Sequence, residues 1–94
     1  MSVLVIGGDR LGRIPDRLRN AGFAEVEHVT GRKKRDVLFR IAAHHDVVVV
    51  LTDFVNHGLA RRIKEQAKDE GKHVVFARRS WSDISRALYP FGAH

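Results

Sequence analysis

The stretch "DVVVVLTDFVNHG" (46–58) joins the most apolar run of the chain to an abrupt series of polar residues. The run 47–51 is short, continuous and almost entirely β-branched, which predicts a strand covered on both faces of a parallel sheet. Four polar side chains follow it within six positions: Thr52, Asp53, Asn56 and His57. The stretch therefore predicts a buried strand that carries polar groups to one end of a sheet.

Strand and helix patterns alternate along the rest of the chain. Apolar or alternating runs predict strands over 2–8, 23–31, 46–53 and 72–79. Apolar residues at helical spacing predict helices over 13–22, 32–45, 56–71 and 80–90. Asn56 is expected to cap the third helix, and Ser80 or Ser82 the fourth.

Alternating strands and helices give a parallel sheet with helices on both faces, because each helix returns the chain to the end of the sheet where the previous strand began. Right-handed crossovers limit the possible arrangements. The strands 2–8 and 46–53 are the most apolar and belong in the middle, whereas 23–31 alternates and belongs at an edge. We predict a single α/β domain over residues 1–94. Its fold would be a small doubly wound, Rossmann- or flavodoxin-like sheet with strand order 2-1-3-4.

The composition bounds the function. The formal net charge of +6 favours an anionic partner, although it also serves solubility alone. The absence of cysteine excludes a disulfide, a thiolate metal site and a cysteine nucleophile, and it fits a reducing compartment. No basic segment precedes the first apolar run, and no run approaches the ~18 apolar residues of a membrane span. We expect a cytoplasmic protein without a membrane partner.

In a doubly wound sheet, ligands bind beyond the carboxyl ends of the strands, where the strand order reverses. Here that point lies between the first and third strands. Gly7 and Gly8 allow the backbone to approach a ligand closely, and Asn56 and His57 open a helix whose free N–H groups suit an anion. Asn56 could instead serve only as a cap, and His57 could be a partly exposed loop residue. Asp53 could orient His57, but a local Asx turn is the favoured role.

All four predicted strand ends carry cations, which would form a basic rim for phosphates. Taken alone, the run 32–35 could be a solvated face. Trp81 could stack on a base or anchor the last helix in the core. The predicted anion- or nucleic-acid-binding residues are Gly7, Gly8, Arg10, Arg13, Arg32, Lys33, Lys34, Asn56, His57, Arg78, Arg79 and Ser80.

Catalytic and cofactor patterns are weak. The glycines of "GGDRLGR" (7–13) stand at 7, 8 and 12 and miss the spacing of a dinucleotide fingerprint. The six histidines show no metal-ligand spacing, and Asp9 with Asp53 is the only candidate pair for a divalent ion. The sequence therefore predicts no catalytic residue, no cofactor and no metal.

The segments "VLVIGG", "VVVVLTDFVNHG", "RRIKEQAKDEGKHVVFARRS" and "ISRAL" resemble a bacterial family catalogued as domain of unknown function 2325. The resemblance covers nearly the whole chain and implies a small Rossmann-like fold without an established catalytic activity. The first loop, "GGDRLGRIP" (7–15), is more basic than expected for the family, so the anion argument rests on this sequence itself.

The favoured function is a non-enzymatic binding module for a phosphate-bearing partner, above all RNA or single-stranded nucleic acid. The alternative is a sensor that binds a nucleotide or another phosphorylated small molecule at the switch point. A third interpretation is an interaction module whose basic rim meets an acidic protein. Exposed sheet edges also favour a homodimer.

Overall fold

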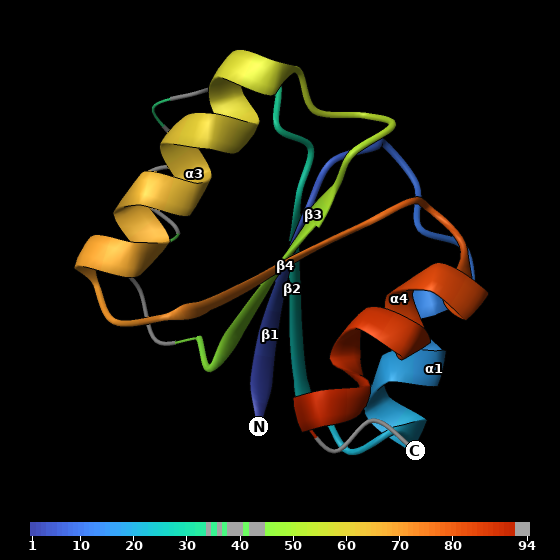
Figure 1. Ribbon diagram of the computed structural model, residues 1–94. Helices are drawn as coiled ribbons and strands as arrows, with labels where there is room; N and C mark the ends of the chain where they lie inside the picture. Colours follow the sequence, from blue (N-terminus) through green and yellow to red (C-terminus); the bar gives the residue numbers. More distant parts are fainter. Residues whose placement is uncertain (34, 36, 38–40, 42–44, 92–94) are drawn as a thin grey trace.

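The computed structural model describes residues 1–33, 35, 37, 41 and 45–91. Four parallel strands form one sheet in the predicted order β2-β1-β3-β4. The strands are β1 (Ser2–Ile6), β2 (Glu25–Val29), β3 (Val47–Leu51) and β4 (His73–Ala77). The helices whose ends both lie among the described residues are α1 (Ile14–Asn20), α3 (His57–Asp69) and α4 (Trp81–Leu88), and a 3₁₀ turn, η1 (Tyr89–Phe91), follows the last (Figure 1).

The predicted helix over 32–45 falls mostly outside the described residues. Of those that are described, Arg35, Val37 and Ile41 are helical, and the last two are buried. The other predicted elements are confirmed, with ends that differ from the structure by one or two residues. No helix among the described residues is long and apolar enough to cross a membrane.

The core has two layers because β1 and β3 are buried on both faces. Every residue of 3–6 and 47–51 is fully buried. Alternate side chains point to opposite faces. Val3 and Val49 pack with α1 and α4 on one face, and Leu4 and Val48 pack with α3 on the other. Each such side chain contributes about 1.5–3 kcal/mol to folding relative to an exposed one.

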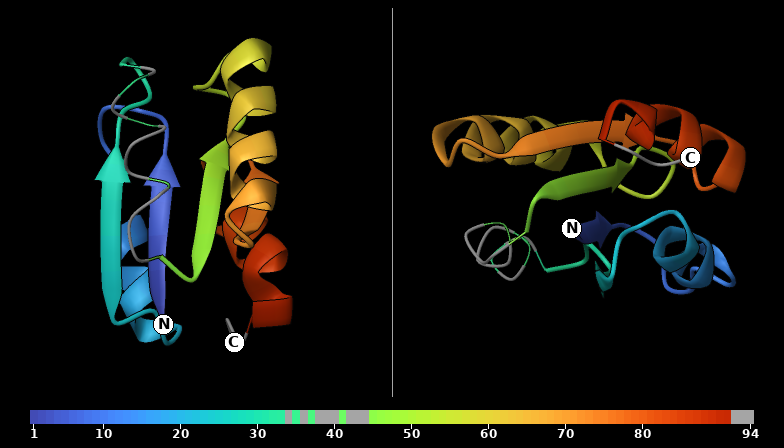
Figure 2. Two further views of the ribbon diagram at one scale, coloured as in Figure 1. Left: turned by 90° about the vertical axis from the view of Figure 1, so that its left-hand side faces the viewer. Right: turned by 90° about the horizontal axis from the view of Figure 1, so that it is seen from below.

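The parallel register brings the carboxyl ends of all four strands to the same end of the sheet. Ile6 pairs with Val29 on one side and with Val50 on the other, and Leu51 pairs with Ala77. In Figure 2 (left) the arrowheads of β2, β1 and β3 point to the same end. We call the loops that leave the carboxyl ends of the strands, residues 7–13, 30–33, 52–56 and 78–80, the rim.

Side chains at the rim also begin two helices, as predicted. Asn56 Oδ1 accepts a hydrogen bond from the N–H of Leu59 at 2.8 Å. Ser80 Oγ accepts one from the N–H of Asp83 at 3.1 Å. These caps satisfy N–H groups that a helix start leaves without partners.

Gly7 is required where β1 turns into the rim. Its φ of 121° disfavours any residue with a Cβ, and an added Cβ would lie 3.1 Å from Leu51 Cβ and 3.2 Å from Val55 Cγ2. Gly22 has a similar φ of 107°, but nothing lies within 4 Å of its added Cβ. A Cβ would therefore strain the backbone at both positions, but only at Gly7 would it also lack space.

We expect Gly22→Ala to lower the free energy of unfolding by about 1–3 kcal/mol through φ strain alone. Gly7→Ala should lower it further, because Leu51 and Val55 must also move. Urea denaturation of both variants measures the difference. Equal losses for the two variants would contradict the close packing at the end of β1.

Candidate anion-binding rim

The β1 end of the rim is held by backbone and aromatic contacts. The N–H of Gly7 donates to the carbonyl of Val29 at 2.9 Å, and His28 Nε2 lies 3.0 Å from the Gly7 carbonyl oxygen. The ring of Phe54 lies over Gly8, since a Cβ added there would be 3.7 Å from Phe54 Cγ. Phe54 remains 51% exposed. An aromatic face therefore stands at the switch point between β1 and β3.

Asp53 ties the loop after β3 to the loop after β4. Its two carboxylate oxygens accept from the N–H of Arg79 at 3.1 and 3.2 Å. The favoured prediction for Asp53, a local Asx turn, has no support in these contacts, because the N–H that donates to its carboxylate lies 26 positions away in the chain. The negative charge of Asp53 is therefore directed at a backbone donor of the neighbouring loop.

Arg79 in turn reaches the loop after β1. Its Nε donates to the carbonyl of Arg10 at 2.8 Å, and its Nη2 lies 3.8 Å from a Cβ built on Gly12. β1 and β4 are not adjacent, because β3 lies between them. Arg79 thus bridges the rim across the end of β3 and has a structural role there.

Asp9 and Arg32 form a third connection, between the loops after β1 and β2. The Arg32 guanidinium donates to the Asp9 carboxylate, and both side chains are largely exposed. Asp9 and Asp53 therefore point to separate partners. Within the described part of the chain, no group of acidic or histidine side chains has the arrangement of a metal site.

The predicted site residues fall into two groups. Gly7, Arg32, Asn56, Arg79 and Ser80 make the structural contacts described above. The exposed side chains with no hydrogen bond or ion pair to another described residue are Arg10, Arg13, Lys33, His57 and Arg78. Gly8 is buried beneath Phe54, and Lys34 lies outside the described residues.

Of the two aromatic side chains near the rim, the exposed one is not the one that the sequence suggested. Trp81 is half-buried and packs against the core cluster of α1 and α4, which is the anchoring alternative. Phe54 was missed, because a phenylalanine within an apolar context is usually a core residue. Gly8, which the Phe54 ring covers, was the available sequence signal.

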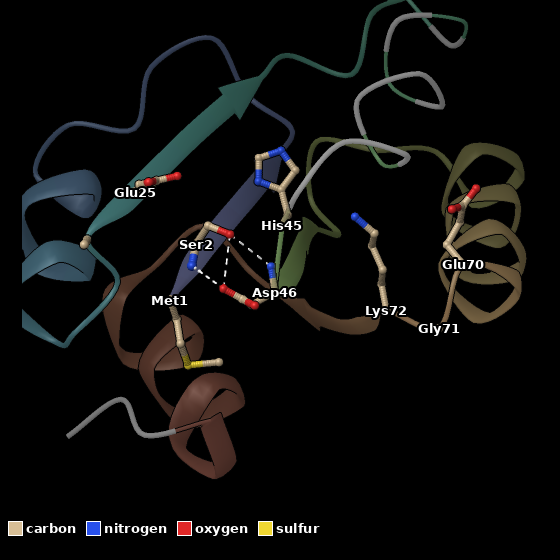
Figure 3. Close-up of a pocket in the computed structure, with 9 residues that line it drawn as sticks. Met1, Ser2, Glu25, His45, Asp46, Glu70, Gly71 and Lys72 are labelled. Carbon is tan, nitrogen blue, oxygen red and sulfur yellow. Dashed lines mark hydrogen bonds between the residues drawn. The ribbon is translucent and has the colours of Figure 1, made fainter.

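The opposite end of the sheet, where the strands begin, contains a hollow of about 500 Å³ (Figure 3). Its lining includes Glu25, Asp46 and Glu70 but also Lys72, so it does not concentrate one sign of charge. His45 borders it with a side chain only 8% exposed, and its Nε2 lies 3.2 Å from Glu27 Oε1. The rim, with its excess of cations, is the better place for an anion.

An all-parallel sheet with a glycine turn at its switch point defines a small Rossmann-like α/β domain. The chain belongs to the family described as "Uncharacterized protein conserved in bacteria (DUF2325)", whose model matches residues 2–90. No curated protein and no solved structure matches the chain.

Asp46 lies at the end of the sheet where the strands begin, and it makes a pH-dependent contribution to the free energy of unfolding. The backbone N–H of Ser2 donates to Asp46 Oδ2 at 2.7 Å, and the Ser2 hydroxyl adds a second hydrogen bond at 3.2 Å. The Ser2 backbone hydrogen bond is the main cause that lowers the pKa of the Asp46 carboxyl below its ordinary value. The folded protein therefore favours the charged form of this group.

Because the pKa is lowered on folding, the contribution is complete above the ordinary pKa of an aspartate and is lost as pH falls through the folded pKa. We expect Asp46→Asn to be less stable than the wild type at pH 7. The gap should close as both proteins are acidified below the ordinary aspartate pKa. Thermal melts across this range test it, and a gap that stays constant down to strong acid would contradict the charge effect.

Proposed function

We propose that this protein is a non-enzymatic binding module for a phosphate-bearing partner, RNA or single-stranded nucleic acid above all, and that the rim is its binding surface. The observation that carries the proposal is a set of exposed cations on three separate rim loops. They are Arg10 and Arg13 after β1, Lys33 after β2 and Arg78 after β4. Positive groups spaced along one edge suit a chain of phosphates better than a single charge.

The acidic residues of the rim do not cancel this charge. Asp53 accepts hydrogen bonds from a backbone N–H, and Asp9 is paired with Arg32. Asp9 is offset by Arg32, whereas a hydrogen bond from a neutral N–H leaves the charge of Asp53 in place, so the remaining rim cations outnumber one negative charge. The exposed rim cations have no acidic partner among the described residues, so they stay available to an incoming anion; they are Arg10, Arg13, Lys33 and Arg78.

Phe54 supports a ligand with unpaired bases. Its ring is half-exposed, and it lies beside the Gly7–Gly8 turn, where the backbone can approach a ligand. Aromatic faces beside cations are the usual surface for single strands, because every base can stack while its phosphates meet the positive groups. A duplex keeps its bases stacked inside and would gain nothing from Phe54.

The start of α3 adds a favourable dipole to the rim. Asn56 caps the helix, and His57 and Gly58 follow it as exposed residues of the first turn. The positive end of a helix dipole stabilises a phosphate placed there. A cytoplasmic location, where RNA is made and translated, suits this proposal.

A nucleotide sensor is the competing function. A small ligand is usually enclosed over most of its surface, whereas Asp53, Phe54 and Asn56 around the switch point are exposed. This openness favours a polymer. A single mononucleotide that stabilises the protein by several degrees, with no effect of RNA, would reverse the choice.

Binding should depend steeply on salt and on the rim cations. The triple change Arg10→Gln, Arg13→Gln and Arg78→Gln should weaken binding of a mixed-sequence single-stranded RNA. It should also reduce the slope of log affinity against log salt by roughly 2, since each phosphate contact contributes about 0.7 for a single strand. Filter binding at a series of salt concentrations gives both quantities.

The matched control removes the same charge away from the rim, through Arg62→Gln, Lys64→Gln and Lys68→Gln. These residues are exposed and lie on α3 beyond its first turn. The control should retain the wild-type slope. No retention of RNA by the wild type at low salt, or equal losses in the two triple variants, would refute the rim as the binding surface.

Phe54→Ala should weaken single-stranded RNA binding by about 5- to 150-fold, which corresponds to about 1–3 kcal/mol for one stacked base. Binding of inorganic polyphosphate, which has no bases, should not change, and Phe54→Trp should retain RNA binding. Fluorescence anisotropy measures both ligands. An equal effect of Phe54→Ala on both ligands would show that the ring shapes the loop and does not stack on a base.

A further inference from the structure

One edge of the sheet lacks the usual protection against pairing with another strand. β4 carries half-buried Val74 and Val75, and Phe76 is 38% exposed. Its register with β3 runs without a bulge over five consecutive pairs. Free edges are normally blocked by charge, proline or a bulge, and β4 has none of these between His73 and Ala77.

The other edge differs from it. β2 presents Glu25, Glu27 and His28, which discourage association. Figure 2 (right) shows β4 at the outside of the sheet, with α3 and α4 on its two sides, and no described element lies beyond it. The β4 edge is therefore the apolar and accessible edge of the described sheet.

The backbone of β4 determines how it can be paired. The N–H of Thr52 donates to the carbonyl of Ala77 at 2.9 Å, so the polar backbone groups of Ala77 face β3. Because this direction alternates along a strand, those of Val75 also face β3. The N–H and C=O groups of Val74 and Phe76 then face outward.

We propose that a second copy of this chain pairs with β4 in the antiparallel direction, about a two-fold axis through Val75. This register places Val74 opposite Phe76 of the second copy. Each such pair exchanges two N–H···O bonds, so all outward groups of Val74 and Phe76 gain partners. The result is a continuous eight-stranded sheet.

The side chains fit a copy of the same strand. Val74 packs against the α3 layer, and Phe76, two positions further on, projects to the same face. The two-fold places each exposed Phe76 beside Val74 of the second copy, a favourable aromatic and β-branched pair. Val75 lies on the α4 face and meets its own equivalent at the axis.

The charges near this edge are complementary to themselves. Asp83 and Arg86 of α4 border a shallow hollow together with Phe76 and Ala77. A two-fold axis sets the two α4 helices antiparallel on the same face. Asp83 then approaches Arg86 of the second copy, and Arg86 approaches its Asp83. These two ion pairs on the α4 face offset the like charges of Lys72 and Arg78 of the second copy, which the same register places opposite each other at the two ends of the paired strands.

The axis reverses the strands, so the two rims of the dimer point in opposite directions. If the proposed function holds, the dimer would bind two separate stretches of nucleic acid. The dimer itself does not depend on that function, and the tests below contain no nucleic acid.

The test introduces one cysteine into a chain that has none. At Val75 the two copies would meet as a pair without hydrogen bonds, where the Cα atoms are about 4.5 Å apart, within the range of a disulfide. Val75→Cys should therefore form a covalent dimer rapidly under mild oxidation. The control Glu25→Cys, on the β2 edge, should remain monomeric on a non-reducing gel at the same concentration.

Two further measurements do not require the Val75→Cys variant to fold. Sedimentation should find the wild type dimeric at about 100 μM and Phe76→Lys monomeric with unchanged circular dichroism. Asp83→Arg should weaken the dimer, and Asp83→Arg combined with Arg86→Asp should restore it. A monomeric wild type, equal crosslinking of both cysteine variants, or no rescue by the double change would overturn the proposal.

Discussion

The parallel direction of all four strands is the constraint on which the rest of the structure depends. Because all four strands run in the same direction, the loops that follow them all begin at the same end of the sheet. Burial of β1 and β3 on both faces holds these two strands at the centre of the sheet, where helices cover them on either side. The position of the rim is thus a consequence of the core.

The loops of the rim are joined by polar contacts between segments far apart in the chain. Asp53 accepts from the backbone of Arg79, and the Arg79 side chain donates to the backbone of Arg10. Asp53 and Arg79 therefore hold together the loops after β1, β3 and β4. This division leaves a basic surface whose remaining cations are free to meet an external anion.

Much of the fold could be predicted from the sequence because its signals are local. The apolar content of 47–51 predicted that this strand lies in the centre, and Asn56, a favourable capping residue, predicted the start of α3. The partner of Asp53 could not be predicted, since Arg79 is 26 positions away and no pattern links them. The exposure of Phe54 also escaped, because it depends on how the β3 loop folds over Gly8. Local rules reach the caps and strands, whereas the rim is assembled by contacts between loops.

The central claim is that anions bind this protein at the rim, beyond the carboxyl ends of the strands. Amide chemical shifts of isotope-labelled protein, followed while a short single-stranded RNA is added at low salt, test it most directly. The account predicts concentration-dependent shifts at Gly7, Gly8 and Arg10, with none at Asp46 and Lys72, at the end of the sheet where the strands begin. Shifts centred on Asp46 and Lys72, or no shifts at all, would contradict it.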